Sequence, residues 1–332
     1  MTLETTRMQA DIVGTEAADT LEWHERRLAL PFRFGEWPLW TAHFAGLSAH
    51  PDPFTTTPIA DPGAPAATLG ARRHSAAFIY SCPTVTELPI LQVRGGWLRY
   101  VVSQYPHYSV DVSGSFDTYL QSFRGKTLST LRRKIRRAGD TNERQPLTVR
   151  YDTAAAFGEF FELAGPISRQ SYQQRLFGTG LPETAAFRRE IAAKADRGDI
   201  MGFILFLHDQ PAAYTLCPRT APGVVLYDHT GYDPACEQWS PGTVLQYAII
   251  EALFADPKTR TYDLCTGGGR HKDLFATGNQ PCANIYFLRI LSWPMPVALA
   301  HRAVLQMSAL AKSALERLRL RDRVKKLMRR YA

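Results

Sequence analysis

In the stretch TYDLCTGGGRHKDLFATG, residues 261–278, an acidic residue is followed by three consecutive glycines and then by three consecutive basic side chains. Asp263 lies in a strand-like run, and Arg270, His271 and Lys272 follow directly after the glycines. A glycine-rich turn at the end of a strand can present two cations and an imidazole to a substrate or a phosphate group. The spacing matches neither the dinucleotide-binding fingerprint nor the P-loop. A surface loop without a ligand is an equal alternative.

A second candidate site lies upstream, where YDHTGYDPACEQWSPGTVL runs from a strand through a turn into an apolar helix. The tetrapeptide SPGT, residues 240–243, opens that helix. Proline fits the first helical turn, and a glycine beside it lets an anion approach amides that the helix dipole makes attractive to negative charge. An ordinary N-cap by Ser240 is the alternative. His229, between Asp228 and Thr230, is either a functional or a purely structural histidine.

The cations of the chain are concentrated in two segments. Residues 124–144 hold eight basic and two acidic side chains, and residues 301–332 hold ten basic and two acidic. The rest of the chain is net acidic, although the whole carries a charge of +8. This asymmetry indicates local anionic contacts more than a nucleic-acid-binding body. In the first segment, apolar residues recur at helical spacing from Leu128 to Ala138, so a solvated basic helix face is the alternative to a binding surface.

Composition excludes several classes of protein. At 45% apolar and 21% charged residues, the chain is composed like a globular protein with a sizeable core. Five scattered cysteines without a CxxC pair, and histidines without ligand spacing, predict neither a disulfide framework nor a metal site. The first residues lack an apolar signal core, and the late apolar stretch is interrupted by His301 and Arg302. We therefore expect a cytoplasmic protein without a metal.

The elements that must position these residues alternate strands with single helices. We expect a helix at Glu16–Ala29, a long loop at Pro51–Gly70 and a helix at Phe116–Ala138. A further helix is expected at Glu183–Arg197. The expected strands are 8–13, 76–80, 88–93, 97–102 and 147–152, followed by the strands of the last third. Runs of antiparallel strands interrupted by single helices predict an α+β fold with a mixed, mostly antiparallel sheet flanked by helices.

Four segments resemble the GNAT acyltransferases, in particular the CelD/BcsL-like branch of cellulose-biosynthesis-type acetyltransferases, which is similar to the FemABX tandem-GNAT proteins. DQPAAYTLC resembles that branch's G-x-P-V-A-Y hairpin, and GYDPACEQWSPGTVL resembles Y-D-P-x-x-x-x-x-S-P-G-x-x-L. YDLCTGGGRHKDLFA resembles F-D-F-x-x-G-x-x-x-Y-K-x-x-F-A, with His271-Lys272 in place of Tyr-Lys. The segment starting FDTYLQS resembles the family's F-x-x-Y-L-x-S-x-x-x-K-T-x-x-x-x-R-R helix through Phe116, Tyr119, Leu120, Ser122, Lys126, Thr127, Arg132 and Arg133.

The resemblance implies an organisation into four segments. Residues 1–115 would form an N-terminal, degenerate GNAT-like domain, and residues 116–145 a basic connecting helix. Residues 146–291 would form the C-terminal GNAT acyltransferase domain. A basic amphipathic helical tail, residues 292–332, would close the chain.

The resemblance also implies transfer of an acyl group, most often acetyl, from acyl-CoA to an amine of a small molecule or saccharide precursor. The implied catalytic candidates are Asp263, His271, Asp228 and His229, with His271 in the position of the acid that protonates the thiolate. The residues implied to hold the coenzyme are Tyr227, Ser240, Pro241, Gly242, Thr243 and Val244. Those implied to bind the acceptor are Lys126, Arg132, Arg133, Arg270 and Lys272.

Two other functions stay open from the sequence. A FemABX-like transferase would take an amino acid from charged tRNA, although aromatic residues are not interleaved with the basic ones as stacking would require. Otherwise nucleic acid is not expected as a partner. A non-catalytic scaffold of a polysaccharide or lipid pathway would use the basic tail, residues 301–332, as a peripheral contact with the inner membrane face.

Overall fold

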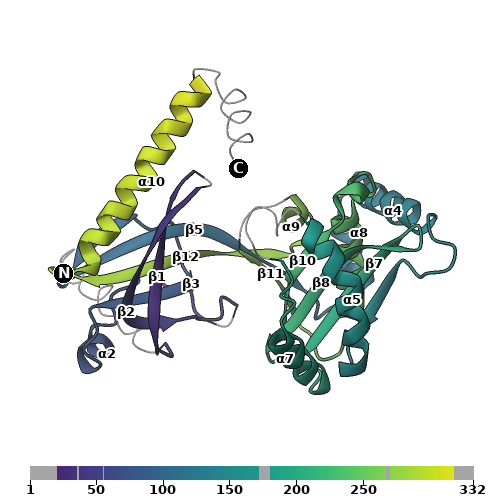
Figure 1. The fold of residues 1–332 in the computed structure, drawn as a ribbon, viewed down its shortest axis with the longest axis horizontal. Coiled ribbons are helices and arrows are strands. Elements are labelled where there is room, and N and C mark those ends of the chain that lie inside the picture. Colours follow the sequence, from purple (N-terminus) through teal and green to yellow (C-terminus); the bar gives the residue numbers. More distant parts are fainter. Residues whose placement is uncertain (1–20, 36, 55, 172–179, 267–269, 318–332) are drawn as a thin grey trace. The chain divides into compact units, whose positions relative to one another are not determined.

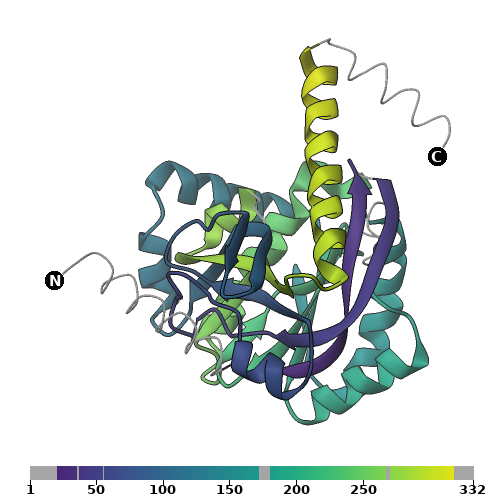
Figure 2. The same ribbon diagram turned by 90° about the vertical axis from the view of Figure 1, so that its left-hand side faces the viewer.

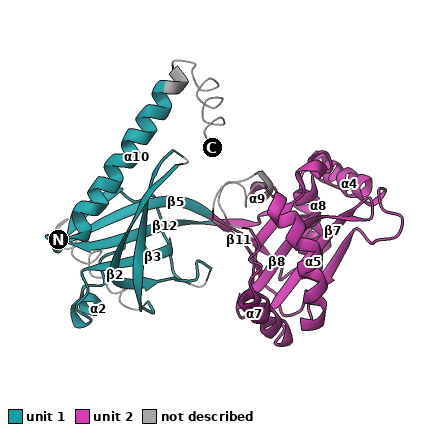
Figure 3. Ribbon diagram, in the orientation of Figure 1, with its two compact units in different colours: residues 1–106, 280–332 teal, residues 107–279 magenta. Residues whose placement is uncertain are grey.

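The structure, a computed structural model, describes residues 21–35, 37–54, 56–171, 180–266 and 270–317, without the side chains of 266, 270, 271 and 315–317. The chain divides into two compact units, shown in different colours in Figure 3. Unit 1 comprises residues 1–106 and 280–332, and unit 2 comprises residues 107–279. The boundaries of these two units differ from those of the four segments expected from the sequence. The division of the chain into four domains remains a prediction.

The sheet of unit 1 has the strand order β1-β2-β3-β12-β5 (Figure 1). Its strands are β1 (His24–Phe34), β2 (Trp37–Ala49), β3 (Ala76–Pro83), β5 (Trp97–Asp111) and β12 (Gly278–Arg289), and β4 (Leu91–Arg94) pairs with β5. Strands β1 and β2 form a long antiparallel hairpin, whereas β2 and β3 run parallel. Strands β5 and β12 each extend into unit 2.

The helix expected at Glu16–Ala29 is wrong over its described C-terminal part, because β1 begins at His24. The buried residues of β1 are Leu28, Leu30 and Phe32, with exposed residues between them. This period of two is that of a strand with one face against the core. The expected strand at 8–13 lies outside the described residues.

Two helices accompany this sheet: α2 (Ala66–Ala71) and α10 (Pro294–Arg317). His301 attaches α10 to the sheet, with Nε2 at 3.1 Å from the carbonyl oxygen of Pro31 and Nδ1 at 2.6 Å from the hydroxyl of Tyr100. Because the carbonyl can only accept, Nε2 carries the proton, and the Tyr100 hydroxyl donates to Nδ1. Burial of His301 lowers its pKa, which favours this neutral form.

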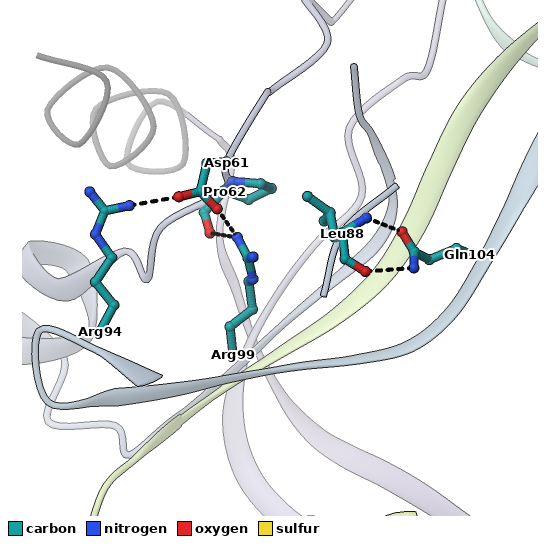
Figure 4. A network of polar contacts seen from close by, with 6 residues as sticks. All are labelled: Asp61, Pro62, Leu88, Arg94, Arg99 and Gln104. Atoms are coloured by element: carbon teal, nitrogen blue, oxygen red, sulfur yellow. Dashed lines mark hydrogen bonds and ion pairs between the residues drawn. The ribbon is translucent and has the colours of Figure 1, made fainter. Parts of the chain in front are cut away.

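A buried arginine holds the long loop before α2 against the β4–β5 hairpin (Figure 4). The carboxylate of Asp61 accepts hydrogen bonds from Arg99 and, at 2.8 Å, from Arg94, while Arg99 also donates to the carbonyl of Pro62 at 3.1 Å. Arg99 is only 5% exposed. A buried guanidinium needs such a partner, so the loop is fixed where it meets the hairpin.

Unit 2 has the strand order β5-β11-β9-β8-β7-β6, with β10 paired to β8. The strands are β6 (Thr148–Tyr151), β7 (Ile200–Leu207), β8 (Gln210–Ala221), β9 (Val224–Leu226), β10 (Asp228–Tyr232) and β11 (Thr261–Thr266). The helices are α3 (Phe116–Gln121), α4 (Gly125–Gly139), α5 (Ala154–Gln170), α7 (Ala185–Asp196), α8 (Pro241–Phe254), α9 (Arg270–Phe275) and the 3-10 helix η1 (Pro234–Trp239). Within the described residues of unit 2, neighbouring strands pair antiparallel, except that β9 and β11 run parallel.

Strand β7 shows how unit 2 builds its core. All eight residues of IMGFILFL are buried, since helices cover both faces of the sheet. Met201, Phe203, Leu205 and Leu207 belong to one hydrophobic cluster, together with residues of α4 and α8. Ile200, Ile204 and Phe206 belong to a second cluster, together with residues of α5 and α7.

These observations confirm the fold class expected from the sequence: helices flank a mixed, mostly antiparallel sheet. The helix expected at Phe116–Ala138 is instead two helices, α3 and α4, separated by residues 122–124. The helix expected at Glu183–Arg197 is confirmed as α7. The strand expected at 88–93 is shorter, since β4 begins at Leu91.

Candidate functional site

The candidate site begins where two neighbouring strands part. Strand β9 runs parallel to β11, and the last pair in this register is Leu226 with Asp263. The backbone N–H of Tyr227 still donates to the carbonyl of Asp263, at 2.7 Å. From Asp228 onward the chain, now β10, pairs with β8 instead. The pairing of β10 with β8 shifts in register between Asp228 and Thr230, and His229 between them has φ +22°. This bulge turns the chain away from β11.

A cavity of about 480 Å³ lies beside this bulge, within unit 2. Strands β8 and β10, helix η1 and the start of α8 contribute its walls. The residues that line it are Ala213, Thr215, Tyr227, Thr230, Gly231, Tyr232, Glu237, Ser240, Pro241, Gly242, Thr243 and Leu245. Five of the six positions expected to hold the coenzyme therefore surround one cavity. The sixth, Val244, is buried in the hydrophobic core instead.

The first turn of α8 offers fewer free amides than the sequence suggested. Ser240 has left-handed backbone angles, φ 55° and ψ 50°, and its side chain does not cap the helix. Its carbonyl accepts from the N–H groups of Thr243 and Val244, at 2.9 and 3.1 Å. Pro241 has no N–H, so Gly242 is the residue of this turn whose N–H has no hydrogen-bond partner among the described residues. A side chain at Gly242 would meet no atom within 4 Å, which leaves its amide accessible.

The phenol of Tyr227 lies on the wall of this cavity and donates to Thr230 Oγ1 at 3.1 Å. Burial raises the pKa of Tyr227 to about 12, so the phenol keeps its proton at neutral pH. Asp228 and His229 do not belong to the cavity lining. Asp228 Oδ1 accepts the backbone N–H of His229 at 2.8 Å, and the His229 ring packs edge-on against Phe187.

Asp263 pairs with a histidine that the sequence did not single out. His107 Nε2 lies 2.6 Å from Asp263 Oδ1, and the backbone N–H of Cys265 donates to the same oxygen at 2.7 Å. Both side chains are buried, at 4% and 7% exposure. The antiparallel register of β5 and β11, which places His107 opposite Thr266, brings them together. No local motif could reveal a partner 156 residues away.

Lys272 and Cys265 complete the polar surroundings of Asp263. Partial burial lowers the pKa of Lys272, while the nearby Asp263 carboxylate and Cys265 counteract this shift. Burial and the Asp263 charge both raise the pKa of the Cys265 thiol, so it stays protonated and is a poor nucleophile. Cys265 Sγ lies 3.2 Å from the carbonyl oxygen of Tyr227, where β9 and β11 part.

The remaining predicted positions are divided between a second cavity and the surface. Lys126 lines a cavity of about 280 Å³ with Lys134 of α4 and Thr243 of α8, so this cavity shares Thr243 with the larger one. Arg132 and Arg133 are exposed and line neither cavity. Arg270 and His271 belong to helix α9, but the structure does not describe their side chains.

The part of the chain that forms this site matches a known protein family. Residues 125–273 match the family model described as an acetyltransferase (GNAT) domain. This part of the chain is therefore similar to a GNAT acetyltransferase domain. It includes helix α4, the larger cavity, all lining residues of the second cavity except Leu274, and Asp263, whereas His107 precedes it.

Comparison with curated proteins gave no match. Among solved structures, the chain is similar to a C-terminal domain assigned to a lysylphosphatidylglycerol synthetase of Agrobacterium fabrum, with 11% identity, coverage of 90% of this chain and 97% of the other, and a TM-score of 0.48. FemX has 12% identity, coverage of 86% and 97%, and a TM-score of 0.45. A GCN5-related N-acetyltransferase of Kribbella flavida has 12% identity, coverage of 88% and 97%, and a TM-score of 0.33.

Proposed function

We propose that unit 2 transfers an acyl group, acetyl being the expected one, from a coenzyme A thioester to an amine. The observation that supports this most directly is the parting of β10 from β11 at Tyr227, beside a cavity that reaches the first turn of α8. A thioester needs such a slot for its acyl end and an anion-accepting helix turn for its phosphates. The acetyltransferase domain matched over residues 125–273 supports the same chemistry.

In this proposal the neutral amine attacks the thioester carbonyl, a carbon–nitrogen bond forms, and the carbon–sulfur bond breaks. The oxyanion of the intermediate needs a preorganised N–H donor. The N–H of Tyr227 is occupied by the Asp263 carbonyl, whereas that of His229 is held only by the partly exposed Asp228 side chain. The thioester oxygen would displace this carboxylate, so His229 contributes its backbone amide and not its ring.

The pair of His107 and Asp263 would supply the base. Asp263 can only accept, so His107 Nε2 carries the proton that it donates. The ammonium proton would pass to this imidazole directly or through water, and Asp263 would stabilise the resulting imidazolium. His271 stays the expected acid for the leaving thiolate. Its side chain lies outside the described residues.

The acceptor is proposed from charge. Lys272 beside Asp263, and Lys126 in the second cavity, would attract an acceptor that carries a carboxylate or phosphate besides its amine. A small molecule or a saccharide precursor of the cytoplasm fits this description. Membership of the CelD/BcsL-like branch and a tandem of GNAT-like domains stay predictions from the four sequence matches.

Ligand-induced stabilisation tests the proposal. At about 100 times its dissociation constant, a ligand that binds only the folded chain adds about 2.7 kcal/mol of stability. We expect acetyl-CoA, a longer acyl-CoA or free CoA to raise the unfolding temperature. Gly242→Phe should abolish that rise, because its ring would fill the mouth of the cavity. Gly114→Phe is the matched control, since it also has open space around it. Failure of every CoA compound to stabilise the chain would contradict the proposal.

A second candidate, transfer of an amino acid from charged tRNA, is favoured by one observation. Helix α4 exposes Arg132, Arg133, Arg136 and Arg137 on the side opposite its buried residues Leu131 and Ala138. Neutralised phosphates make nucleic-acid binding strongly dependent on salt. Binding of tRNA that weakens steeply with salt, without any effect of CoA, would favour this candidate over the first.

A further inference from the structure

One face of the unit 1 sheet carries an arginine where the strand pattern places core residues. Along β5, Trp97, Arg99 and Val101 point to the same face, because side chains alternate along a strand. Val101 and Leu69 of helix α2 are buried in one hydrophobic cluster, and Trp97 packs against it. Figures 1 and 2 show α2 against the strands of unit 1. Arg99 therefore lies on the face of the sheet that α2 covers.

The contacts of Arg99 leave part of its guanidinium unsatisfied. Asp61 accepts hydrogen bonds from both Arg99 and Arg94, so Arg99 shares this carboxylate (Figure 4). Arg99 is 5% exposed, and its Nε is buried without a hydrogen-bond partner among the described residues. A buried donor without an acceptor costs free energy. Arg99 also lines a cavity of about 130 Å³, which gives a further acceptor a place near this side chain.

A larger cavity, of about 430 Å³, adjoins the small one. The two cavities share Ala66, Gly95 and Trp97 in their walls. Arg73, two residues after α2, and Arg289, the last residue of β12, line the larger cavity. Both arginines are exposed, and neither has an ion-pair partner among the described residues. Their charges are therefore available to a ligand.

The rest of the lining also suits an anion. His74 lines the larger cavity with Nε2 at 3.4 Å from the carboxylate of Glu25. Among the described residues, no aspartate or glutamate lines either cavity. Gly95 and Gly96 form the β4–β5 turn with φ 54° and 79°, and a side chain at either would meet no atom within 4 Å. The wall beside this turn is therefore open, so a small molecule can enter.

The chemistry of the walls indicates the class of ligand. A guanidinium binds phosphate and carboxylate oxygens through two parallel hydrogen bonds. A phosphate monoester has the charge and the oxygen atoms to accept from two arginines at once. The half-buried Trp97, which lines both cavities, offers an aromatic surface for the organic part of such a ligand. Inorganic phosphate would leave this surface unused.

We infer that the two adjoining cavities, which we name the Trp97 site, bind a small phosphate monoester. Its phosphate would lie between Arg73 and Arg289, with the organic part against Trp97. All residues of the Trp97 site belong to unit 1, so the inference does not depend on the proposed transfer reaction.

A phosphate monoester can be a soluble molecule or the headgroup of a lipid. None of the helices in the described residues is long and apolar enough to span a bilayer. Competition by vesicles distinguishes the two sources. Displacement of a bound soluble ester by vesicles that contain phosphatidic acid, but not by phosphatidylcholine alone, would assign the site to a headgroup. Lack of displacement by both would assign it to a soluble ester.

Calorimetric titration of the full chain tests the inference, with phenyl phosphate, glucose 1-phosphate and inorganic phosphate as probes. We expect at least one ester to bind more tightly than inorganic phosphate. Arg73→Gln/Arg289→Gln should weaken ester binding at least about tenfold, because two charged donors are lost. The matched control is Arg26→Gln/Arg33→Gln, which removes two exposed arginines of β1 outside both cavities with the same change in net charge. Both double variants should keep the unfolding temperature of the wild type.

Two further variants locate the bound ester. Trp97→Phe should remove the change in tryptophan fluorescence that the ester causes in the wild type. Gly242→Phe, which fills the cavity of the proposed transfer site, should bind the ester as the wild type does. Three results would overturn the inference: no ester binds more tightly than inorganic phosphate, the two double variants bind the ester equally, or Gly242→Phe abolishes ester binding.

Discussion

The imidazole of His107 donates a hydrogen bond of 2.6 Å to the buried carboxylate of Asp263. The two residues lie on adjacent antiparallel strands, and the same carboxylate oxygen also accepts the backbone N–H of Cys265. The arrangement fixes the tautomer of the ring and ties it to the strand that parts from β9. The first prediction depends on this pair.

Substitution of His107 by glutamine should slow acyl transfer by about 10²- to 10⁴-fold, the usual contribution of a general base. Glutamine can still donate a hydrogen bond to Asp263, so the fold and the affinity for the CoA donor should be preserved. The measurement is the transfer rate at saturating concentrations of donor and acceptor. A variant with an unchanged rate would exclude His107 as the base.

Acidification should destabilise unit 1 through His301. Burial lowers the pKa of this histidine in the folded state, so the unfolded chain binds the proton more readily. Its contribution to stability is therefore present above the ordinary histidine pKa of 6.5 and is lost as the pH falls towards the folded value. The measurement is the free energy of unfolding against pH. His301→Gln should flatten this dependence.

Substitution of Asp61 by asparagine should destabilise unit 1 by about 1–3 kcal/mol, because the buried Arg99 loses its charged partner. Denaturant unfolding measures the loss. Glu183→Gln is the matched control, since it breaks an exposed pair with Arg169 whose contribution is expected at about 0–1 kcal/mol. Equal effects of the two variants would show that Arg99 finds other partners.

Two glycines of unit 2 should respond to alanine in opposite directions. At Gly202 a methyl group would lie 2.7 Å from the Phe160 ring, so Gly202→Ala should cost about 1–3 kcal/mol of stability. Gly158, in helix α5, has no atom within 4 Å of such a methyl group, so Gly158→Ala should stabilise by about 0.5–1 kcal/mol. Thermal unfolding of both variants measures the difference. A neutral Gly202→Ala would mean that the Phe160 ring can move aside.

Local sequence patterns were sufficient to predict an element where the residues of that element determine its structure. Proline at Pro241 predicted the start of α8, and apolar residues at helical spacing predicted a helix that buries Leu131 and Ala138 on one side. The register of β5 against β11 is a property of the whole sheet, so His107 could not be paired with Asp263 from the sequence. The first turn of α8 shows a similar limit, because the left-handed backbone of Ser240 decides which amides stay free.

The wrong helix at Glu16–Ala29 has a different cause. Leu21 and Leu28 fit a helical repeat, but Leu28 also begins the alternation of Leu28, Leu30 and Phe32. A short apolar pattern can satisfy both periods. Pairing with β2 decided the outcome, and β2 lies further along the chain.

The composition of unit 1 from two separate stretches, residues 1–106 and 280–332, affects how the protein is made. During synthesis the ribosome completes residues 107–279 before it reaches β12, which pairs with β3. Until then, β3 lacks the neighbour that covers one of its edges. Unit 2 can therefore fold while unit 1 is still incomplete. The exposed edge of β3 is the part of the nascent chain that most needs protection from aggregation.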